Sequence, residues 1–183
     1  SDEGPNTGGM GAYSPAPVVT PEIHARAMRE VILPTVLGMK ADGIPYTGFL
    51  YAGLMINPDG QIKTLEFNCR MGDPETQPIM ARLESDLVDT LDKAIDGKLD
   101  EVELKWDRRI ALGVVMAAHQ YPDTPRTVDV IQGIPNPTDD QIVFHAGTKL
   151  QDGNLITSGG RVLCVVGLAD TVKAAQQKAY SAI

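Results

Sequence analysis

The segment GQIKTLEFNCRMGDPETQP, residues 60–78, holds the clearest structural signal in this chain. Two runs rich in β-branched, aromatic and other apolar residues, 47–56 and 61–69, flank the tetrapeptide NPDG at residues 57–60. Such a turn between two strand-like runs is a strong hairpin signal. The pattern predicts two antiparallel strands, followed after Arg70 by an irregular connection that contains proline.

Side chains of the second predicted strand alternate between its two faces. One face is expected to carry Leu65, Phe67 and Cys69, and the other Thr64, Glu66 and Asn68. Glu66 and Asn68 would then lie about 6.6 Å apart, at roughly 3.3 Å per residue. A carboxylate and a carboxamide supply the oxygen ligands that Mg²⁺ prefers. An exposed polar strand face explains the same pattern, so the residues alone leave both interpretations open.

Three further features just beyond or before this hairpin have two interpretations each. The Arg70 guanidinium can bind a phosphate or carboxylate through two parallel hydrogen bonds, or form a surface ion pair with Asp73 or Glu75. Asp73 can hold a substrate ammonium group or accept hydrogen bonds from loop amides. The opening stretch GPNTGGMGAYSP, residues 4–15, is either a linker or a loop that brings backbone N–H groups against an anion.

The glycine-rich opening does not contain the P-loop or dinucleotide-binding motif. Its glycines Gly8, Gly9 and Gly11 nevertheless permit positive φ angles and a close backbone approach. The segment TSGGRVL, residues 157–163, has a similar composition and predicts at least a tight turn between strands, with a ligand contact as the second interpretation.

Helical signals surround the predicted hairpin. Thr20 and Pro21 suit the start of a helix that ends near Gly43 and is expected to kink or restart at Pro34. A second helix is predicted over 79–95, because apolar residues recur there at every fourth position. They are Ile79, Leu83, Leu87, Leu91 and Ile95.

The second half of the chain has a different character. After the charged stretch 98–109, short strand-like runs are separated by Pro, Gly, Asn and Asp, and a last helix follows with Asp170 as its predicted N-cap. We therefore predict an α+β fold in which residues 1–105 combine an antiparallel sheet with helices, and residues 106–183 form a small β-rich domain.

Composition limits the classes of function. The 183 residues are 43% hydrophobic and carry a formal net charge of −8, which argues against nucleic-acid binding. No apolar run approaches the roughly 18 residues of a membrane span. Cys69 and Cys164 match no zinc or redox spacing, and we expect both to be buried free thiols in a reducing cytosol.

The segments GPNTGGMGAYSP, GFLYAGLM, LEFNCRMGDPETQP, LGVVMAA, FHAGTKL and SGGRVLCVVGL together resemble the glycinamide ribonucleotide synthetases. These are cytoplasmic purine-biosynthesis ligases with the ATP-grasp fold. The resemblance covers essentially all 183 residues, although many members have Phe where this chain has Met71. It implies part of an ATP-grasp domain, followed by a small β-rich C-terminal domain.

The resemblance also implies an activity. The family joins glycine to 5-phosphoribosylamine, consumes ATP, and passes through a glycyl phosphate before releasing ADP and phosphate. Glu66 and Asn68 would bind the Mg²⁺ or Mn²⁺ that bridges the ATP phosphates, and Arg70 would neutralise charge on the transferring group. Gly8, Gly9 and Asp73 would lie against the substrate.

Compared with the family, this sequence is expected to lack an N-terminal part of the same polypeptide and a short C-terminal piece, so the chain alone should be inactive. Two alternatives use the same residues. One is another ATP-grasp carboxylate–amine ligase. The other is a non-catalytic module that binds anions through its glycine loops.

Overall fold

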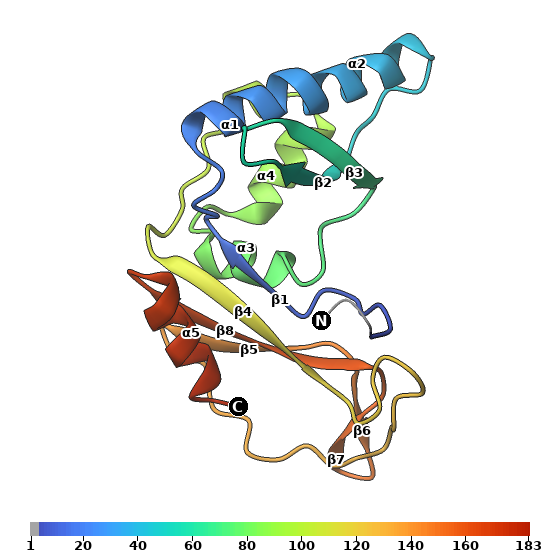
Figure 1. Cartoon of the computed structure of the whole chain (residues 1–183), viewed down its shortest axis with the longest axis vertical. Helices are drawn as coiled ribbons and strands as arrows, with labels where there is room; N and C mark the ends of the chain where they lie inside the picture. The colour runs from blue at the N-terminus through green and yellow to red at the C-terminus, as the bar shows by residue number, and fades with distance from the viewer. Residues whose placement is uncertain (1–3) are drawn as a thin grey trace. The chain divides into compact units, whose positions relative to one another are not determined.

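The computed structural model describes residues 4–183, and by their contacts these form two compact units (Figure 1). Unit 1 comprises the described residues up to Ser14, then Asp73–Glu84 and Lys105–Ile183. Unit 2 comprises Pro15–Gly72 and Ser85–Leu104. The chain therefore leaves unit 1 twice and returns to it twice.

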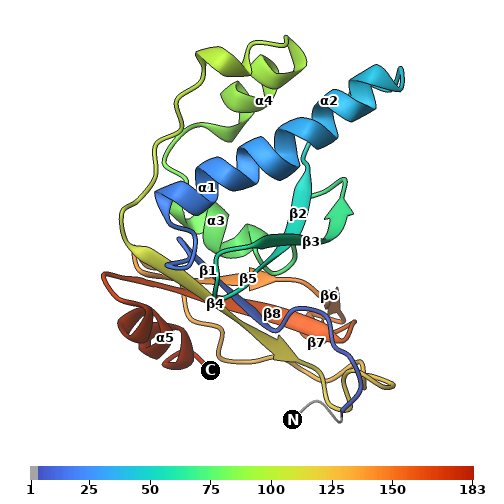
Figure 2. The same ribbon diagram turned by 45° about the horizontal axis from the view of Figure 1, so that its top comes forward.

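Unit 1 is built on a four-stranded antiparallel sheet with the strand order β1-β4-β8-β5 (Figure 2). Its strands are β1 (Gly11–Ser14), β4 (Ile110–Ala117), β5 (Gln141–His145) and β8 (Arg161–Ala169). A separate hairpin joins β6 (Thr148–Gln151) to β7 (Asn154–Thr157). The first strand was not predicted, because a four-residue strand inside a glycine-rich stretch has no readable alternation.

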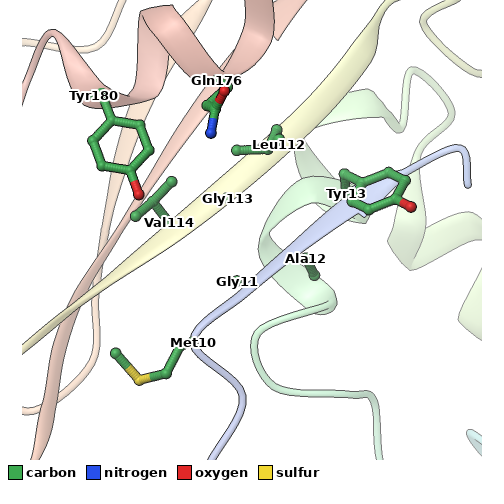
Figure 3. Close-up of a pocket in the computed structure, with 9 residues that line it drawn as sticks. All are labelled: Met10, Gly11, Ala12, Tyr13, Leu112, Gly113, Val114, Gln176 and Tyr180. Atoms are coloured by element: carbon green, nitrogen blue, oxygen red, sulfur yellow. The ribbon is translucent and has the colours of Figure 1, made fainter. Parts of the chain in front are cut away.

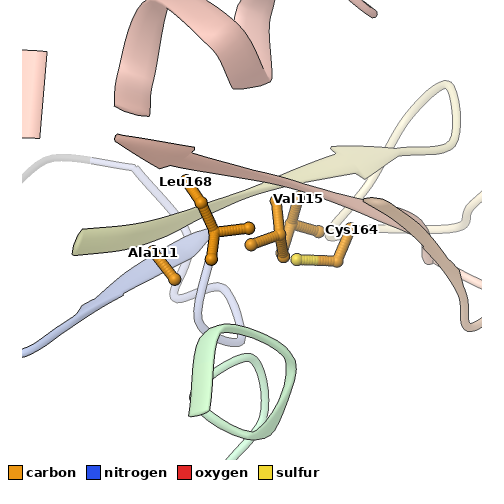
Figure 4. Packing of buried hydrophobic residues seen from close by; sticks show 5 residues of the cluster. Ala111, Val115, Cys164 and Leu168 are labelled. Carbon is orange, nitrogen blue, oxygen red and sulfur yellow. The ribbon is translucent and has the colours of Figure 1, made fainter. Parts of the chain in front are cut away.

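Helices cover both faces of this sheet. On one face, Cys164 and Leu168 of β8 pack with Ala111 and Val115 of β4 in a buried cluster, which the partly buried Ala81 of α3 (Thr76–Arg82) contacts (Figure 4). On the other face α5 (Val172–Tyr180) lies directly on β8. A Cβ at Gly167 would lie 2.4 Å from the carbonyl oxygen of Ala175, so only glycine allows this approach.

Unit 2 begins with three helical segments that follow one another directly. They are α1 (Pro21–Ala27), the π-helical η1 (Met28–Ile32) and α2 (Leu33–Ala41). Thr20 caps the first as predicted, since its hydroxyl accepts a hydrogen bond from the Ile23 N–H at 3.3 Å. Pro34 lies in the first turn of α2 and has no backbone N–H to donate to the preceding turn. The predicted disturbance appears in that preceding turn, which is the π-helical η1.

The predicted hairpin is present as β2 (Tyr51–Ile56) and β3 (Ile62–Asn68). Unit 2 also contains α4 (Leu87–Ile95) and the short η2 (Leu99–Glu101). In residues 4–183 no helix is long and apolar enough to cross a bilayer.

The single helix predicted over 79–95 is wrong. Helix α3 ends at Arg82, because Leu83 is extended and pairs with Trp106 in an isolated β-bridge. A new helix, α4, starts after Asp86, whose carboxylate accepts hydrogen bonds from the backbone N–H groups of Val88 and Asp89. The two helices belong to different units.

Three smaller predictions also need correction. The last helix is capped by Thr171 rather than Asp170, since the Thr171 hydroxyl accepts from the Ala174 N–H at 3.2 Å. Cys69, which follows the last residue of β3, is exposed, contrary to the prediction; Cys164 is buried as predicted. One of the strand-like runs predicted after the charged stretch, RTVDVIQGI at residues 126–134, forms no named strand and contributes one isolated bridge, between Val130 and Ile156.

Candidate functional site

The hairpin of unit 2 contains a β-bulge next to Glu66. Across the ribbon Tyr51 pairs with Asn68 and Gly53 with Glu66, but the next residue, Leu54, pairs with Thr64. Leu65 is therefore the extra residue on β3.

The bulge decides which side chains share a face. Since paired residues lie on the same side of a ribbon, Glu66 and Asn68 lie on the face of Gly53 and Tyr51. Thr64 pairs with Leu54 and lies on the opposite face, which corrects the simple alternation expected from the sequence. An inserted residue reverses the alternation at the point where it occurs.

Gly53 makes room for the side chain of Glu66. A Cβ at this glycine would lie 3.1 Å from Cγ of Glu66 and 3.6 Å from Cε1 of Tyr51. The Glu66 side chain thus passes over Gly53 beside the Tyr51 ring. Glu66 is exposed and Asn68 is half-buried. Within residues 4–183 no side-chain hydrogen bond or ion pair occupies the Glu66 carboxylate or the Asn68 carboxamide.

These oxygen atoms fit a divalent cation of the Mg²⁺ type. Mg²⁺ takes one or two protein oxygen ligands and completes its shell with water and substrate phosphates. No group of three His, Cys, Asp or Glu side chains converges anywhere in the described part of the chain. The pair Glu66 and Asn68 therefore suits a metal that arrives with a phosphate ligand, and does not suit a closed structural metal site.

Arg70 lies two residues after the end of β3 and is exposed. Its Nη1 donates a hydrogen bond to the carbonyl oxygen of Met71 at 2.9 Å. A guanidinium has five N–H donors, so most of them are available to an incoming anion. The carboxylate of Asp73, which the sequence offered as one ion-pair partner of Arg70, pairs with Arg161.

A substitution at Gly53 tests whether this glycine sets the position of Glu66. We expect Gly53→Val to weaken Mg²⁺- or Mn²⁺-dependent nucleotide binding by about 10-fold, since groups that orient a metal ligand affect metal affinity by about 10–100-fold. Valine favours strands, so the ribbon should persist. Titration of the full-length protein with Mn²⁺ and ADP, followed by electron paramagnetic resonance, measures the effect. Ala52→Val, on the opposite face, is the control; equal losses in both variants would contradict the assignment.

A second group of predicted residues comes together in unit 1. Arg161, at the start of β8, donates from Nη1 to the carbonyl oxygens of Gly9 and Asp73, both at 3.0 Å. Its Nη2 lies 2.8 Å from Oδ2 of Asp73. The Gly8 N–H donates to the hydroxyl of Tyr121 at 2.8 Å. Gly8, Gly9 and Asp73 are thus neighbours through Arg161.

The glycines of this loop are required by close contacts within the protein. A Cβ at Gly9 would lie 2.5 Å from Cδ of Pro74, and one at Gly8 would lie 2.8 Å from Cζ of Arg161. None of Gly8, Gly9 and Gly11 has a positive φ. The predicted close backbone approach is present, but the group approached is another part of unit 1, and the positive φ expected for an anion-binding nest is absent at these three glycines.

The Asp73 carboxylate has two different oxygen environments. Oδ2 bonds to Arg161, while Oδ1 receives only a long contact of 3.5 Å from Nε2 of Gln77. Burial and, as the smaller cause, the negative charge of Asp73 raise the pKa of the nearby Cys164 thiol to about 11. Cys164 is therefore protonated at neutral pH and does not act as a nucleophile.

Sequence reasoning missed Arg161 and Tyr121 as members of this group. The only signal was the composition of the segment 157–163, which resembles the glycine-rich opening but equally describes a tight turn. The closest contacts of Arg161 span 88 and 152 residues, and no local spacing rule reaches that far.

Unit 1 also has an open groove of about 210 Å³ between β1, β4 and α5 (Figure 3). Met10, Tyr13, Leu112 and Tyr180 are among its lining residues, and none of the nine lining residues is charged. The groove therefore offers no charged side chain to a phosphate or carboxylate, and we do not include it in the site.

Two family sequence models match the chain. The model described as "Phosphoribosylglycinamide synthetase, ATP-grasp (A) domain" matches residues 1–76, and "Phosphoribosylglycinamide synthetase, C domain" matches residues 111–183. The chain belongs to the phosphoribosylglycinamide synthetase family. The resemblance read from the motifs is thereby confirmed.

Curated members of the synthetase family match over the whole chain. A phosphoribosylamine–glycine ligase of Ralstonia nicotianae is 76% identical over 182 residues, which are 100% of this chain and 43% of that protein. The one of Xanthomonas axonopodis pv. citri is 63% identical over 183 residues, 100% of this chain and 42% of that protein. The chain thus spans less than half the length of these relatives.

Solved structures agree with the synthetase fold. The crystal structure of phosphoribosylamine–glycine ligase from Thermotoga maritima matches with a TM-score of 0.82 and 38% identity, covering 98% of this chain and 44% of that chain. A biotin carboxylase from Campylobacter jejuni matches with a TM-score of 0.62 and 15% identity over 92% of this chain and 38% of its own, which is a likeness of fold alone. The predicted fold, part of an ATP-grasp domain followed by a C domain, is confirmed.

Proposed function

We propose that the protein is an ATP-dependent carboxylate–amine ligase that joins glycine to 5-phosphoribosylamine in cytoplasmic purine biosynthesis. The chain would act together with an N-terminal part of the same polypeptide, since it spans only 42–43% of the first two relatives. The observation that carries the proposal is the pair Glu66 and Asn68, whose side-chain oxygens lie on one face of a ribbon in a synthetase-family chain and have no protein partner among residues 4–183.

In this proposal Glu66 and Asn68 hold Mg²⁺ or Mn²⁺, which when bound neutralises charge on the ATP phosphates. A glycine carboxylate oxygen attacks the γ-phosphorus, and ADP leaves. The amine of 5-phosphoribosylamine then attacks the carbonyl carbon of the glycyl phosphate, phosphate leaves, and the amine loses a proton. Arg70 lowers the barrier by offering its free N–H donors to the transferring phosphoryl group.

Asp73, Gly8 and Gly9 of unit 1 are the proposed substrate contacts. The weakly engaged Oδ1 of Asp73 is suited to a hydrogen bond from an ammonium or amine group.

We also retain as a proposal the division of the chain into residues 1–105, half of an ATP-grasp domain, and 106–183, an incomplete C-terminal domain. The two family matches, 1–76 and 111–183, fall on either side of this boundary.

A ligation assay on the full-length protein tests the proposal. With glycine, 5-phosphoribosylamine, ATP and Mg²⁺ we expect glycinamide ribonucleotide, ADP and phosphate in equal amounts, and no product when the metal is chelated or when the 183-residue chain is used alone. Turnover with other amino acids but not with glycine would favour another carboxylate–amine ligase. Magnesium-independent binding of phosphate esters by the chain alone would favour an anion-binding module.

A further inference from the structure

We infer that Arg161 is a positioning residue for the proposed substrate contacts of unit 1, which it orders by fixing Asp73 against the Gly8–Gly9 loop. This inference rests on the proposed function. It concerns a side chain that the family motifs around Glu66 and Asp73 do not include, because Arg161 comes from the distant strand β8.

The contacts of Arg161 join three segments of unit 1. Its guanidinium bonds to the Gly9 carbonyl oxygen, to the Asp73 carbonyl oxygen and to the Asp73 carboxylate, at 3.0, 3.0 and 2.8 Å. The Arg161 side chain is only 25% exposed, whereas that of Asp73 is 51% exposed. The arginine is thus the inner member of the pair, and the carboxylate is the member that a substrate can reach.

The geometry requires a guanidinium. Nη1 serves two carbonyl oxygens while Nη2 serves the carboxylate, so three acceptors are bound by one rigid plane. Gly8 lies so close that a Cβ there would be 2.8 Å from Cζ and 3.0 Å from Nε of Arg161. A lysine ammonium is a single point charge on a flexible stem and does not reproduce this fork.

The consequence for Asp73 is a fixed carboxylate. Because Oδ2 and the backbone carbonyl of the same residue both bond to Arg161, the side chain of Asp73 is held in one orientation and Oδ1 is left for a ligand. The same guanidinium fixes the Gly9 carbonyl, so the loop and the carboxylate keep a constant separation. Misplacement by about 1 Å in such a group can cost about 100-fold in rate.

A double-mutant cycle on the full-length ligase tests the inference. We expect Arg161→Lys to lower kcat/KM for the amino-acid or amine substrate by about 100-fold. The Kd for MgATP should change by less than about 2-fold, because Arg161 is not among the residues proposed to hold the metal. Asp73→Asn should have a similar effect. The double variant should be no worse than the poorer single variant, since both changes break the same arrangement.

Arg126→Lys is the matched control, because Arg126 forms an Arg–Asp pair of the same 2.8 Å length with Asp129 on the surface of unit 1. It should leave kinetics unchanged. If Arg161→Lys does not fold, the kinetics of Asp73→Asn, at the more exposed end of the ion pair, still measure the effect of breaking the pair. Thermal melting shows whether each variant is folded. Unchanged kinetics in Arg161→Lys, or losses that add in the double variant, would overturn the inference. Ligation by the wild type shows independently whether the proposed function holds.

Discussion

Glu66→Gln in the full-length protein is expected to reduce kcat/KM by at least about 100-fold, because even residues that only orient a metal ligand change affinity by about 10–100-fold. Glu66 is the carboxylate of the proposed metal pair, and glutamine keeps its size while removing the charge. The side chain is exposed and has no protein partner within the described residues, so folding should not change. Steady-state kinetics across a Mg²⁺ titration, together with calorimetric titration of MgADP, measures both effects.

Glu22→Gln serves as the matched control for this variant. Glu22 is an exposed carboxylate in the first turn of α1, in the same unit as Glu66, and its loss should alter neither the magnesium dependence nor the rate. Wild-type activity of Glu66→Gln at limiting Mg²⁺ would remove the metal assignment. The ligase assignment would then rest on family membership alone.

Arg70→Lys is expected to lower kcat by about 10²–10³-fold, the usual cost of removing one donor that stabilises developing negative charge. The Kd for the Mg–nucleotide complex should change little, since Arg70 is proposed to act on the transferring group rather than on the bound metal. The separation of kcat from Kd is the diagnostic result. Single-turnover release of phosphate and equilibrium binding of MgADP provide the two quantities.

Arg29→Lys is the control for this second variant. Arg29 is exposed in unit 2 and bonds to Glu30, so it has the same residue type and setting without a proposed catalytic role. An Arg70→Lys protein that binds the nucleotide poorly but turns over at the normal rate would assign Arg70 to ground-state binding instead.

The sequence predicted the hairpin of unit 2 well because its signals are local. The NPDG turn sets the pairing of β2 and β3. Glu66 and Asn68 share a face because they are two residues apart and both follow the bulge. Thr64 was placed on the wrong face because it lies before the bulge. Sequence alternation carries no sign of an inserted residue.

Periodicity misled where tertiary contacts interrupt a helix. Apolar residues at every fourth position continue from Ile79 to Ile95, yet the backbone is extended at Leu83, which pairs with Trp106. Asp86 caps the new helix, but the apolar periodicity alone does not mark a helix start at this residue. The local apolar pattern favours one continuous helix. The pairing of Leu83 with Trp106, more than twenty residues away, ends the first helix instead.

The candidate site residues also differ in whether local sequence can identify them. Glu66, Asn68 and Arg70 come from one short motif, so spacing and family resemblance suffice to name them. The partners of Asp73 could not be named, because Arg161 and Tyr121 reach it and its neighbouring loop only through the folded sheet of unit 1. Composition marks such residues as loop or turn, and only the pairing of distant strands brings them together.

The alternating route of the chain has a consequence for biosynthesis. On the ribosome β1 emerges about a hundred residues before β4, the strand with which it pairs, so the sheet's first edge stays unpaired while all of unit 2 is translated. Pairings this distant in sequence carry a high loop-closure cost and form late. Until β4 and β8 have been synthesised, the nascent polypeptide carries an unmatched strand, the kind of segment that holdase chaperones shield from aggregation.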